Sequence, residues 1–552
     1  MAALAFLALT GSADAATTTT TVTRPADPNA LSRPDRLDRP PIGHRLTGNQ
    51  AIRIALRVPK VAAAHRRHPK GMITPFLKGG TRWQVSFYDA SGRHEVAQVL
   101  IDDGTGVVLE AWTGPQVAWT MARGYPGAFG RKSNALYIWI PLLVLFVAPF
   151  VDWRRPLRIR HLDLLVLCSL SVSLAFFNHA NLDGSVPSSY PPLLYLLGRL
   201  TWIGLRRERT PPEPLKLLVP ASWLAIAVVF LVGFRIGLNV TDSNVIDVGY
   251  AGVIGADRIT HGQPLYGHFP KDNPRGDTYG PVTYLAYVPF EQVLPWHGRW
   301  DDLPAAHAAA VFFDLLCLTA LFLIGRRIRG PTVGIALAYA WVTFPFTLFA
   351  LESNANDGLV AALLALTLLV AARPALRGVL GALAGLAKFA PLALFPLLAT
   401  YTRHGRARFV VAFAATAVVA ALPVILQGDP RAFWDATIHY QAARGAPFSV
   451  WGLYRWPHAL QVAAQAGAVL FALAVAVVPR RRDVVGLAAL MGAVLIALQL
   501  GVTYWFYLYI VWFLPAAFVA LIAQDAEPGA ALTEPEGAPA RSRQPALAGS
   551  SG

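Results

Sequence analysis

Charged residues and cysteines are both scarce in this sequence. Asp, Glu, Lys and Arg together make up 14% of the 552 residues, whereas about 25% is usual in soluble globular domains. Hydrophobic residues make up 55%, and several apolar runs reach the roughly 20 residues that a helix needs to cross a bilayer. The scarcity of charge therefore argues against a soluble protein and predicts a polytopic membrane protein.

Only two cysteines are present, Cys168 and Cys317, and each lies within an apolar run. Because no CxxC spacing exists, the sequence supports neither a disulfide framework nor a zinc site. We expect no cofactor, and no residue spacing supports a divalent metal.

The net charge of +16 would suggest a nucleic-acid partner in a soluble protein. Here the basic residues cluster in short segments between apolar runs, as at 154–160 and 479–482. This distribution is the positive-inside pattern of membrane proteins. We therefore expect membrane lipids and no nucleic acid as partners.

The first 118 residues differ in composition from the rest. Residues 1–16 resemble a signal peptide without a basic start, and residues 17–45, rich in Thr, Pro and Arg, predict a disordered linker. Residues 46–118 combine a helical pattern with the alternating segments RWQVSFYD and EVAQVLID and glycine-containing turns. This part resembles a PepSY domain, which implies a small α+β domain outside the cytoplasm.

From residue 134 onward, apolar runs predict an all-α membrane domain of about eleven transmembrane helices. Basic residues gather in alternate connecting segments, which places the amino-terminal domain outside and a disordered tail, 524–552, in the cytoplasm. Three accessory helices fall within 134–216, and the main membrane domain spans 217–523. The predicted crossings are 134–151, 162–180, 190–205, 217–235, 304–325, 331–350, 357–372, 409–427, 457–478, 484–501 and 503–523.

Two apolar segments do not fit as simple crossings of this topology. The stretch PVTYLAYVPFEQVLP at 281–295 must begin and end outside, so we expect a helix on the outer surface. Residues 378–400 must begin and end inside, and they contain Lys388, Pro391 and Pro396. We therefore predict a re-entrant hairpin with Lys388 near its tip, which is tolerated where it lines a cavity. A straight crossing is the alternative.

Several motifs, in this order, resemble glycosyltransferase family 87, a GT-C group that uses polyprenyl-phosphate sugars. They are DVGYAGVIGADRITHGQPLYG at 247–267, TYGPVTYLAYVPF at 278–290, NANDGLVAALLAL at 354–366, RGVLGALAGLAKFAPLALFPLL at 377–398, GAPFSVWGL at 445–453 and TYWFYLYIVWFLP at 503–515. The resemblance implies a GT-C fold and a membrane enzyme that transfers mannose or a related hexose or pentose. Residues 1–216 lie outside it.

Sugar transfer from a lipid phosphate needs a base that takes the proton of the acceptor hydroxyl. Asp247 follows an apolar run and matches the family's catalytic aspartate of the outer loop, so we predict that it is this base. Asp242 is the rival, and a solvated loop acid is the alternative for both. Val248, Gly249 and Tyr250 replace the family's usual aromatic pair after the acid, so the choice among these sugars does not carry over from the resemblance.

The leaving phosphate needs positive charge, and Lys388 stands alone in an apolar stretch. A lysine there costs about 2.5–3.5 kcal/mol on insertion scales, which an anionic lipid phosphate would offset. Snorkelling or a structural pair with Asp357 is the alternative. The candidate substrate-binding residues are Lys388, Asp242, His261, Tyr279, Asn356 and Asp357.

The aromatic cluster at 504–509 is typical of an interfacial belt, and stacking against a sugar is the alternative. The leading hypothesis is a transferase in a bacterial plasma membrane that glycosylates an envelope glycolipid or glycan. A secondary transporter or lipid flippase is an alternative, because broken apolar segments with a mid-span lysine also occur in transporters. A non-catalytic envelope scaffold is the third.

Overall fold

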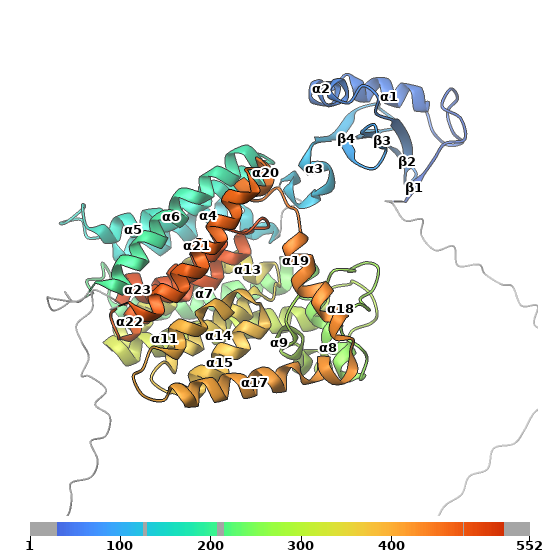
Figure 1. Cartoon of the computed structure of the whole chain (residues 1–552). Coiled ribbons are helices and arrows are strands. Elements are labelled where there is room, and N and C mark those ends of the chain that lie inside the picture. Colours follow the sequence, from blue (N-terminus) through green and yellow to red (C-terminus); the bar gives the residue numbers. More distant parts are fainter. Residues whose placement is uncertain (1–29, 125–129, 207–214, 479, 524–552) are drawn as a thin grey trace, which may run out of the picture. The chain divides into compact units, whose positions relative to one another are not determined.

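The structure, a computed structural model, describes residues 30–124, 130–206, 215–478 and 480–523. The chain divides after Thr120 into two compact units, which we describe separately (Figure 1). The signal-peptide-like residues 1–16 and the tail 524–552 lie outside the described residues.

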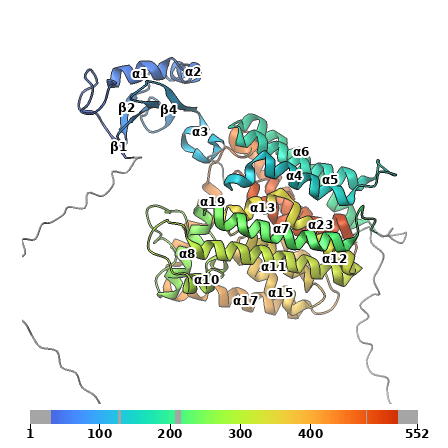
Figure 2. The same ribbon diagram turned by 180° about the vertical axis from the view of Figure 1, so that it is seen from behind.

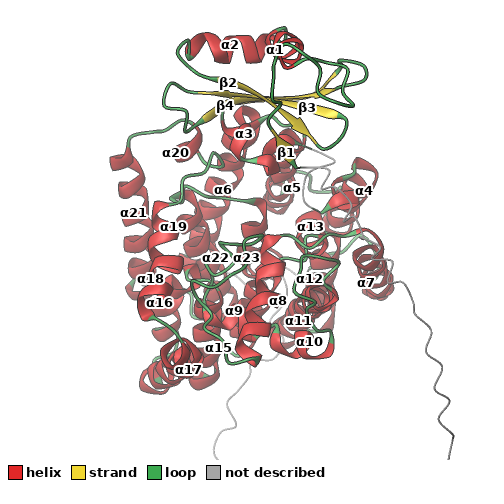
Figure 3. Cartoon of the chain, turned by 90° about the vertical axis from the view of Figure 1, so that its right-hand side faces the viewer, coloured by secondary structure: helices red, strands yellow, loops and turns green. Residues whose placement is uncertain are grey.

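The first unit is a five-stranded antiparallel meander in the order β1-β2-β3-β4-β5, with helices packed on the sheet. Among the described residues, all strands belong to this unit (Figure 3). Its elements are β1 (Leu31–Ser32), α1 (Gly48–Leu56), α2 (Pro59–Arg67), β2 (Ile73–Lys78), β3 (Arg82–Tyr88), β4 (Glu95–Asp102), β5 (Val108–Thr113) and α3 (Pro115–Ala118).

The alternation seen in the sequence builds the core of this unit. Trp83 and Val85 of β3 lie opposite Ile101 and Val99 of β4, and all four are buried against α1 and α2. Alternate side chains of a strand point to one face of a sheet, so this face is covered. The antiparallel sheet expected for this part of the chain is present, and it has five strands.

Part of the predicted linker contributes to the sheet. Leu31 and Ser32 pair with Leu77 and Lys78 of β2. The linker prediction for 17–45 is therefore wrong at these two residues. The backbone N–H and C=O groups at the edge of a sheet can pair with a segment that has no apolar pattern.

The second unit is helical. Its long helices include neighbours that lie side by side, such as α7, α11 and α12 (Figure 2). Its helices are α4 (Leu136–Val147), α5 (Ile159–Asn178), α6 (Leu182–Leu205), α7 (Ala221–Asp242), α8 (Asp247–Thr260), α9 (Pro281–Leu285), α10 (Val288–Val293), α11 (Pro304–Arg329), α12 (Pro331–Thr343), α13 (Pro345–Glu352), α14 (Asp357–Leu369), α15 (Pro374–Ala387), α16 (Phe395–Ala399), α17 (Arg406–Gln427), α18 (Pro430–Trp434), α19 (Tyr440–Ala443), α20 (Val450–Leu453), α21 (His458–Val477), α22 (Val484–Leu500) and α23 (Ile510–Ile522).

A helix stands at each predicted crossing, yet fewer are long and apolar enough to span a membrane alone. Four qualify among the described residues, namely α5, α7, α11 and α21, and α12 and α13, bent by 57° relative to each other, pass the same test only as a pair. Other apolar helices are 10–17 residues long. The membrane character is supported, and the number of eleven crossings stays a prediction.

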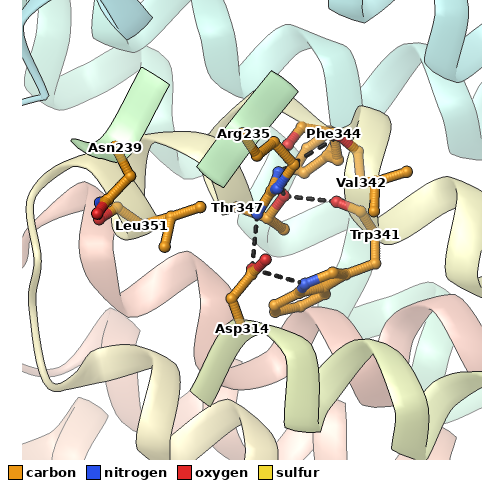
Figure 4. A network of polar contacts seen from close by, with 8 residues as sticks. All are labelled: Arg235, Asn239, Asp314, Trp341, Val342, Phe344, Thr347 and Leu351. Carbon is orange, nitrogen blue, oxygen red and sulfur yellow. Dashed lines mark hydrogen bonds and ion pairs between the residues drawn. The ribbon is translucent and has the colours of Figure 1, made fainter. Parts of the chain in front are cut away.

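A buried polar network holds the bend between α12 and α13 (Figure 4). The guanidinium of Arg235 on α7 lies 2.6 Å from Oδ1 of Asp314 on α11 and donates to Thr347 Oγ1 at 3.0 Å. Trp341 Nε1 also donates to Asp314 Oδ1, at 2.9 Å. Pro345 cannot donate the helical hydrogen bond, so the bend occurs there and the network fixes its direction.

The chain reverses direction at Lys388, as the hairpin prediction requires. α15 ends at Lys388, whose backbone is extended (φ −138°, ψ 137°). The returning residues lie against α15, because a Cβ on Gly385 would come within 2.4 Å of Leu392 and Arg377 Nε donates to the carbonyl of Leu398. The stretch 281–295 forms the two short helices α9 and α10 instead of one helix.

Candidate active site

A cavity of about 670 Å³ lies in the second unit. Its volume is in the range of cavities that enclose small-molecule ligands. Its lining includes the acids Asp247 and Asp357, the cations Lys388 and Arg444, the aromatic residues Tyr279, Tyr504, Tyr509 and Trp512, and the amides Gln441, Gln461, Gln465 and Gln499.

Asp247 is the first residue of α8 and faces the cavity. Although its side chain is exposed to the cavity, it lies among many protein atoms, and this desolvation raises its pKa. The nearby cations Arg444 and Lys388 act in the opposite direction, while Asp357 adds to the rise. A carboxylate with a raised pKa is a stronger base, so this position suits proton abstraction.

Asp357 and Lys388 form a buried ion pair at the cavity wall. Lys388 Nζ lies 2.6 Å from Asp357 Oδ1, and the two side chains are 9% and 1% exposed. Trp512 Nε1 donates to the same oxygen at 2.7 Å, and the ammonium lies 5.0 Å from the ring centre of Tyr279. The structure therefore contains the pair that the sequence offered as the alternative to a free phosphate-binding lysine.

Arg444 is the second cation of the cavity, and it is not among the residues predicted from the sequence. Its guanidinium carbon lies 3.6 Å from the ring centre of Tyr504 and 5.7 Å from that of Tyr440. Stacking on a ring holds the planar guanidinium in place while its edge can still donate. One signal was available, since Arg444 directly precedes the motif at 445–453.

The two segments that carry the acids are joined to each other. Asn354 Nδ2 donates to Ser243 Oγ at 2.8 Å and to the carbonyl of Asn244 at 3.1 Å, and Asn239 Nδ2 donates to Asn354 Oδ1 at 2.9 Å. The backbone N–H of Ile246 donates to the carbonyl of Ser353. These bonds fix the start of α8 against the start of α14, where Asp247 and Asp357 stand.

Close approach at this junction requires glycine. A Cβ on Gly249 would lie 2.1 Å from the carbonyl oxygen of Asn354. Asn354 itself has φ +47°, a left-handed conformation that asparagine adopts more readily than most residues. The residue types of the motifs DVGY and NAND are therefore explained by the geometry that places the two acids.

Three predicted residues lie outside the cavity lining. Asp242 forms an ion pair with Lys132 at 3.4 Å. His261 is exposed, and its ring nitrogen lies 3.2 Å from Asp257 Oδ1. Asn356 is buried and donates to the carbonyl of Val248. Tyr279, by contrast, lines the cavity.

The aromatic cluster at 504–509 is inside the protein, so the prediction of an interfacial belt is wrong. Trp505 and Tyr507 are 5% and 3% exposed, and the hydroxyl of Tyr507 lies within hydrogen-bond distance of Ser173 and Ser185 on the accessory helices α5 and α6. Tyr504 lines the cavity. An aromatic run at a helix end looks alike in sequence whether lipid or protein covers it.

In the part of the chain that the structure describes, no group of three or more His, Cys, Asp and Glu side chains could hold a metal ion.

Residues 278–500 match the family model of Glycosyltransferase family 87. The matched range includes Tyr279, Asp357, Lys388 and Arg444, and Asp247 precedes it. No curated protein matches the chain. Over the matched residues the chain is similar to the glycosyltransferases of family 87, which supports a glycosyltransferase in the membrane.

Proposed function

We propose that the protein transfers a sugar, mannose or a related hexose or pentose, from a polyprenyl-phosphate donor to a hydroxyl group of an envelope glycolipid or glycan. The observation that carries the proposal is the shared cavity in which Asp247 and Arg444 stand beside the Asp357–Lys388 pair. The cavity thereby brings together an acid that can act as a base, Asp247, and a cation that can meet a phosphate, Arg444.

Asp247 is the proposed base. Its carboxylate takes the proton of the acceptor hydroxyl, whose oxygen forms a bond to the anomeric carbon. The bond from that carbon to the donor phosphate breaks, and the phosphate leaves with the electron pair. A phosphate monoester leaves without strong protonation, so this step needs no second acid of the kind found in glycosidases.

Arg444 is the proposed ligand of the donor phosphate. A guanidinium presents parallel N–H donors that match phosphate oxygens, and these charge-assisted bonds are stronger than neutral ones. Lys388 already contacts a carboxylate at 2.6 Å, so its charge is balanced before any donor enters. We assign Lys388 to holding Asp357 and the cavity wall, with only a long-range effect on the phosphate.

Aromatic rings around Lys388 complete the proposed donor site. The ammonium nitrogen of Lys388 lies 5.0, 6.0 and 5.3 Å from the ring centres of Tyr279, Tyr509 and Trp512. All three rings line the cavity. Aromatic faces pack against the C–H groups of sugar rings as they do against other apolar surfaces. We propose that Tyr279 contacts the transferred sugar.

The proposed location is a bacterial plasma membrane, which the protein crosses several times, with the cavity opening outside. The support is the charge pattern of the connecting segments and the position of Asp247 after the long apolar helix α7. The first unit would then lie outside as well. We keep its likeness to a PepSY domain as a proposal, supported by its helices and antiparallel sheet.

A reconstitution assay tests the function. The purified protein in lipid nanodiscs is supplied with radiolabelled polyprenyl-phosphate mannose and an extract of envelope lipids, and labelled products are separated by chromatography. Transfer of label to a new lipid or glycan supports the proposal. Movement of the intact donor across liposome membranes, without a new product, would instead favour the flippase alternative.

A further inference from the structure

The polar residues of α21 all face the cavity. This helix is one of the four long apolar spans, and its polar side chains are His458, Gln461 and Gln465. Each of the three lines the cavity, and their spacing of three and four residues places them on one helix face. Polar side chains in a membrane helix are costly and tend to mark functional sites.

In both glutamines of this face, protein acceptors hold the amide NH2 group, and the amide oxygen can accept a hydrogen bond from a ligand. Gln461 Nε2 donates to the carbonyl of Gly501 at 3.1 Å and to Thr503 Oγ1 at 2.7 Å. Gln465 Nε2 donates to the same carbonyl at 3.0 Å. Within the described ranges, no protein donor bonds to the amide oxygen of either residue. Gln499 differs, because both ends of its amide bond to protein.

The wall that α21, α22 and the turn after α22 contribute to the cavity has no Asp, Glu, Lys or Arg. Its lining residues are His458, Gln461, Val462, Gln465, Leu498, Gln499, Val502 and Thr503. The four charged lining residues, Asp247, Asp357, Lys388 and Arg444, come from other segments. Gln441 of α19 adds a further neutral amide.

We propose that this amide-lined wall is the acceptor subsite and that it takes a neutral, hydroxyl-rich group, such as an uncharged glycan head group. Amide oxygens accept hydrogen bonds from hydroxyls. Lys388 is paired with Asp357 and Arg444 is assigned to the donor phosphate, so an anionic acceptor would lose its hydration against this wall without gaining a cation. That loss costs far more than transferring a neutral group. The assignment rests on the proposed function, because that function makes the second ligand of the cavity an acceptor.

Binding of soluble sugars tests the subsite without catalysis. Saturation-transfer NMR on the protein in nanodiscs that contain polyprenyl phosphate, the ligand proposed for Arg444, compares a neutral trisaccharide, mannotriose, with an anionic one, trigalacturonic acid. We expect mannotriose to bind and trigalacturonic acid to bind more weakly. Gln461→Leu and Gln465→Leu should each weaken mannotriose binding by about two- to tenfold, the effect of a neutral hydrogen bond.

Matched variants show whether weaker binding comes from a lost contact with the sugar or from a disturbed cavity wall. Gln441→Leu removes an amide with no bond to Gly501 and should also weaken mannotriose binding, while Leu470→Gln, on an exposed part of the same helix, should not. Equal binding of the two trisaccharides, or mannotriose binding unchanged in all three leucine variants, overturns the subsite. If mannotriose binds as expected while donor transfer is absent, the subsite stands and the proposed reaction fails.

Discussion

The ammonium of Lys388 lies 2.6 Å from Oδ1 of Asp357, and both side chains are nearly inaccessible to solvent. Lys388 stands at the reversal of a hairpin and Asp357 at the first position of α14. One ion pair therefore ties the hairpin to the segment that also positions Asp247. The pair accounts for a lysine in an apolar stretch without any bound ligand.

The stability of the protein should depend on this pair. Lys388→Met leaves the Asp357 carboxylate buried without its cation, which typically lowers the free energy of unfolding by about 3–5 kcal/mol. The double variant Lys388→Met with Asp357→Asn should recover most of this loss. Thermal unfolding in detergent measures both.

Lys132→Met is the matched control, because the Lys132 side chain is 54% exposed and lies 3.4 Å from Asp242, and ion pairs near the surface contribute about 0–1 kcal/mol. Unchanged stability of Lys388→Met, combined with weaker donor binding, would return the phosphate role to Lys388.

Donor binding should depend on Arg444. Arg444→Gln removes charge-assisted bonds to the phosphate, each contributing about 1.5–3 kcal/mol, so donor affinity should fall by roughly 10–150-fold. Arg444→Lys should keep part of the affinity, since the charge stays and the paired donors are lost. Equilibrium binding of polyprenyl phosphate, with polyprenol as the uncharged comparison, measures the effect. An Arg444→Gln variant that binds both lipids as the wild type does would rule out this role.

The pH profile of transfer should reflect the environment of Asp247. The base acts only when deprotonated, and its desolvation raises the pKa above the ordinary value of about 3.9. Activity should therefore fall on acidification at a higher pH than an ordinary aspartate would give.

Arg444 and Lys388 lower this pKa and Asp357 raises it. In Arg444→Gln the acid limb of kcat/KM should move to still higher pH, because a cation that favours the carboxylate is gone. A shift to lower pH, or no shift, would contradict the assignment of this limb to Asp247.

Charged residues of the candidate site could be predicted from the sequence where they follow or interrupt an apolar run. Asp247 follows a long apolar run and Lys388 interrupts another, so each was visible without a structure. Arg444 was missed because it lies in a polar segment, where an arginine is unremarkable until its stacking on Tyr504 is known. Whether a residue in a polar segment belongs to the site depends on its contacts with segments that are distant in the sequence.

The fold was predictable to a similar degree. The helix positions and the reversal at Lys388 follow from apolar runs, lysine and proline. The bend at Pro345 depends on buried partners on three other elements, and the placement of the 504–509 cluster depends on Ser173 and Ser185 more than 300 residues away. The periodicity of apolar residues along the chain does not show which distant residues will contact one another.

Replacement of Asp247 by Asn tests the central claim most directly, because it removes the proton acceptor at nearly constant volume. Transfer from polyprenyl-phosphate mannose in nanodiscs should fall by roughly 10²–10⁴-fold, while equilibrium binding of the donor stays close to that of the wild type. Asp242→Asn, outside the cavity, is the control and should retain most activity. Full transfer by Asp247→Asn, or loss of transfer in Asp242→Asn alone, would contradict the account.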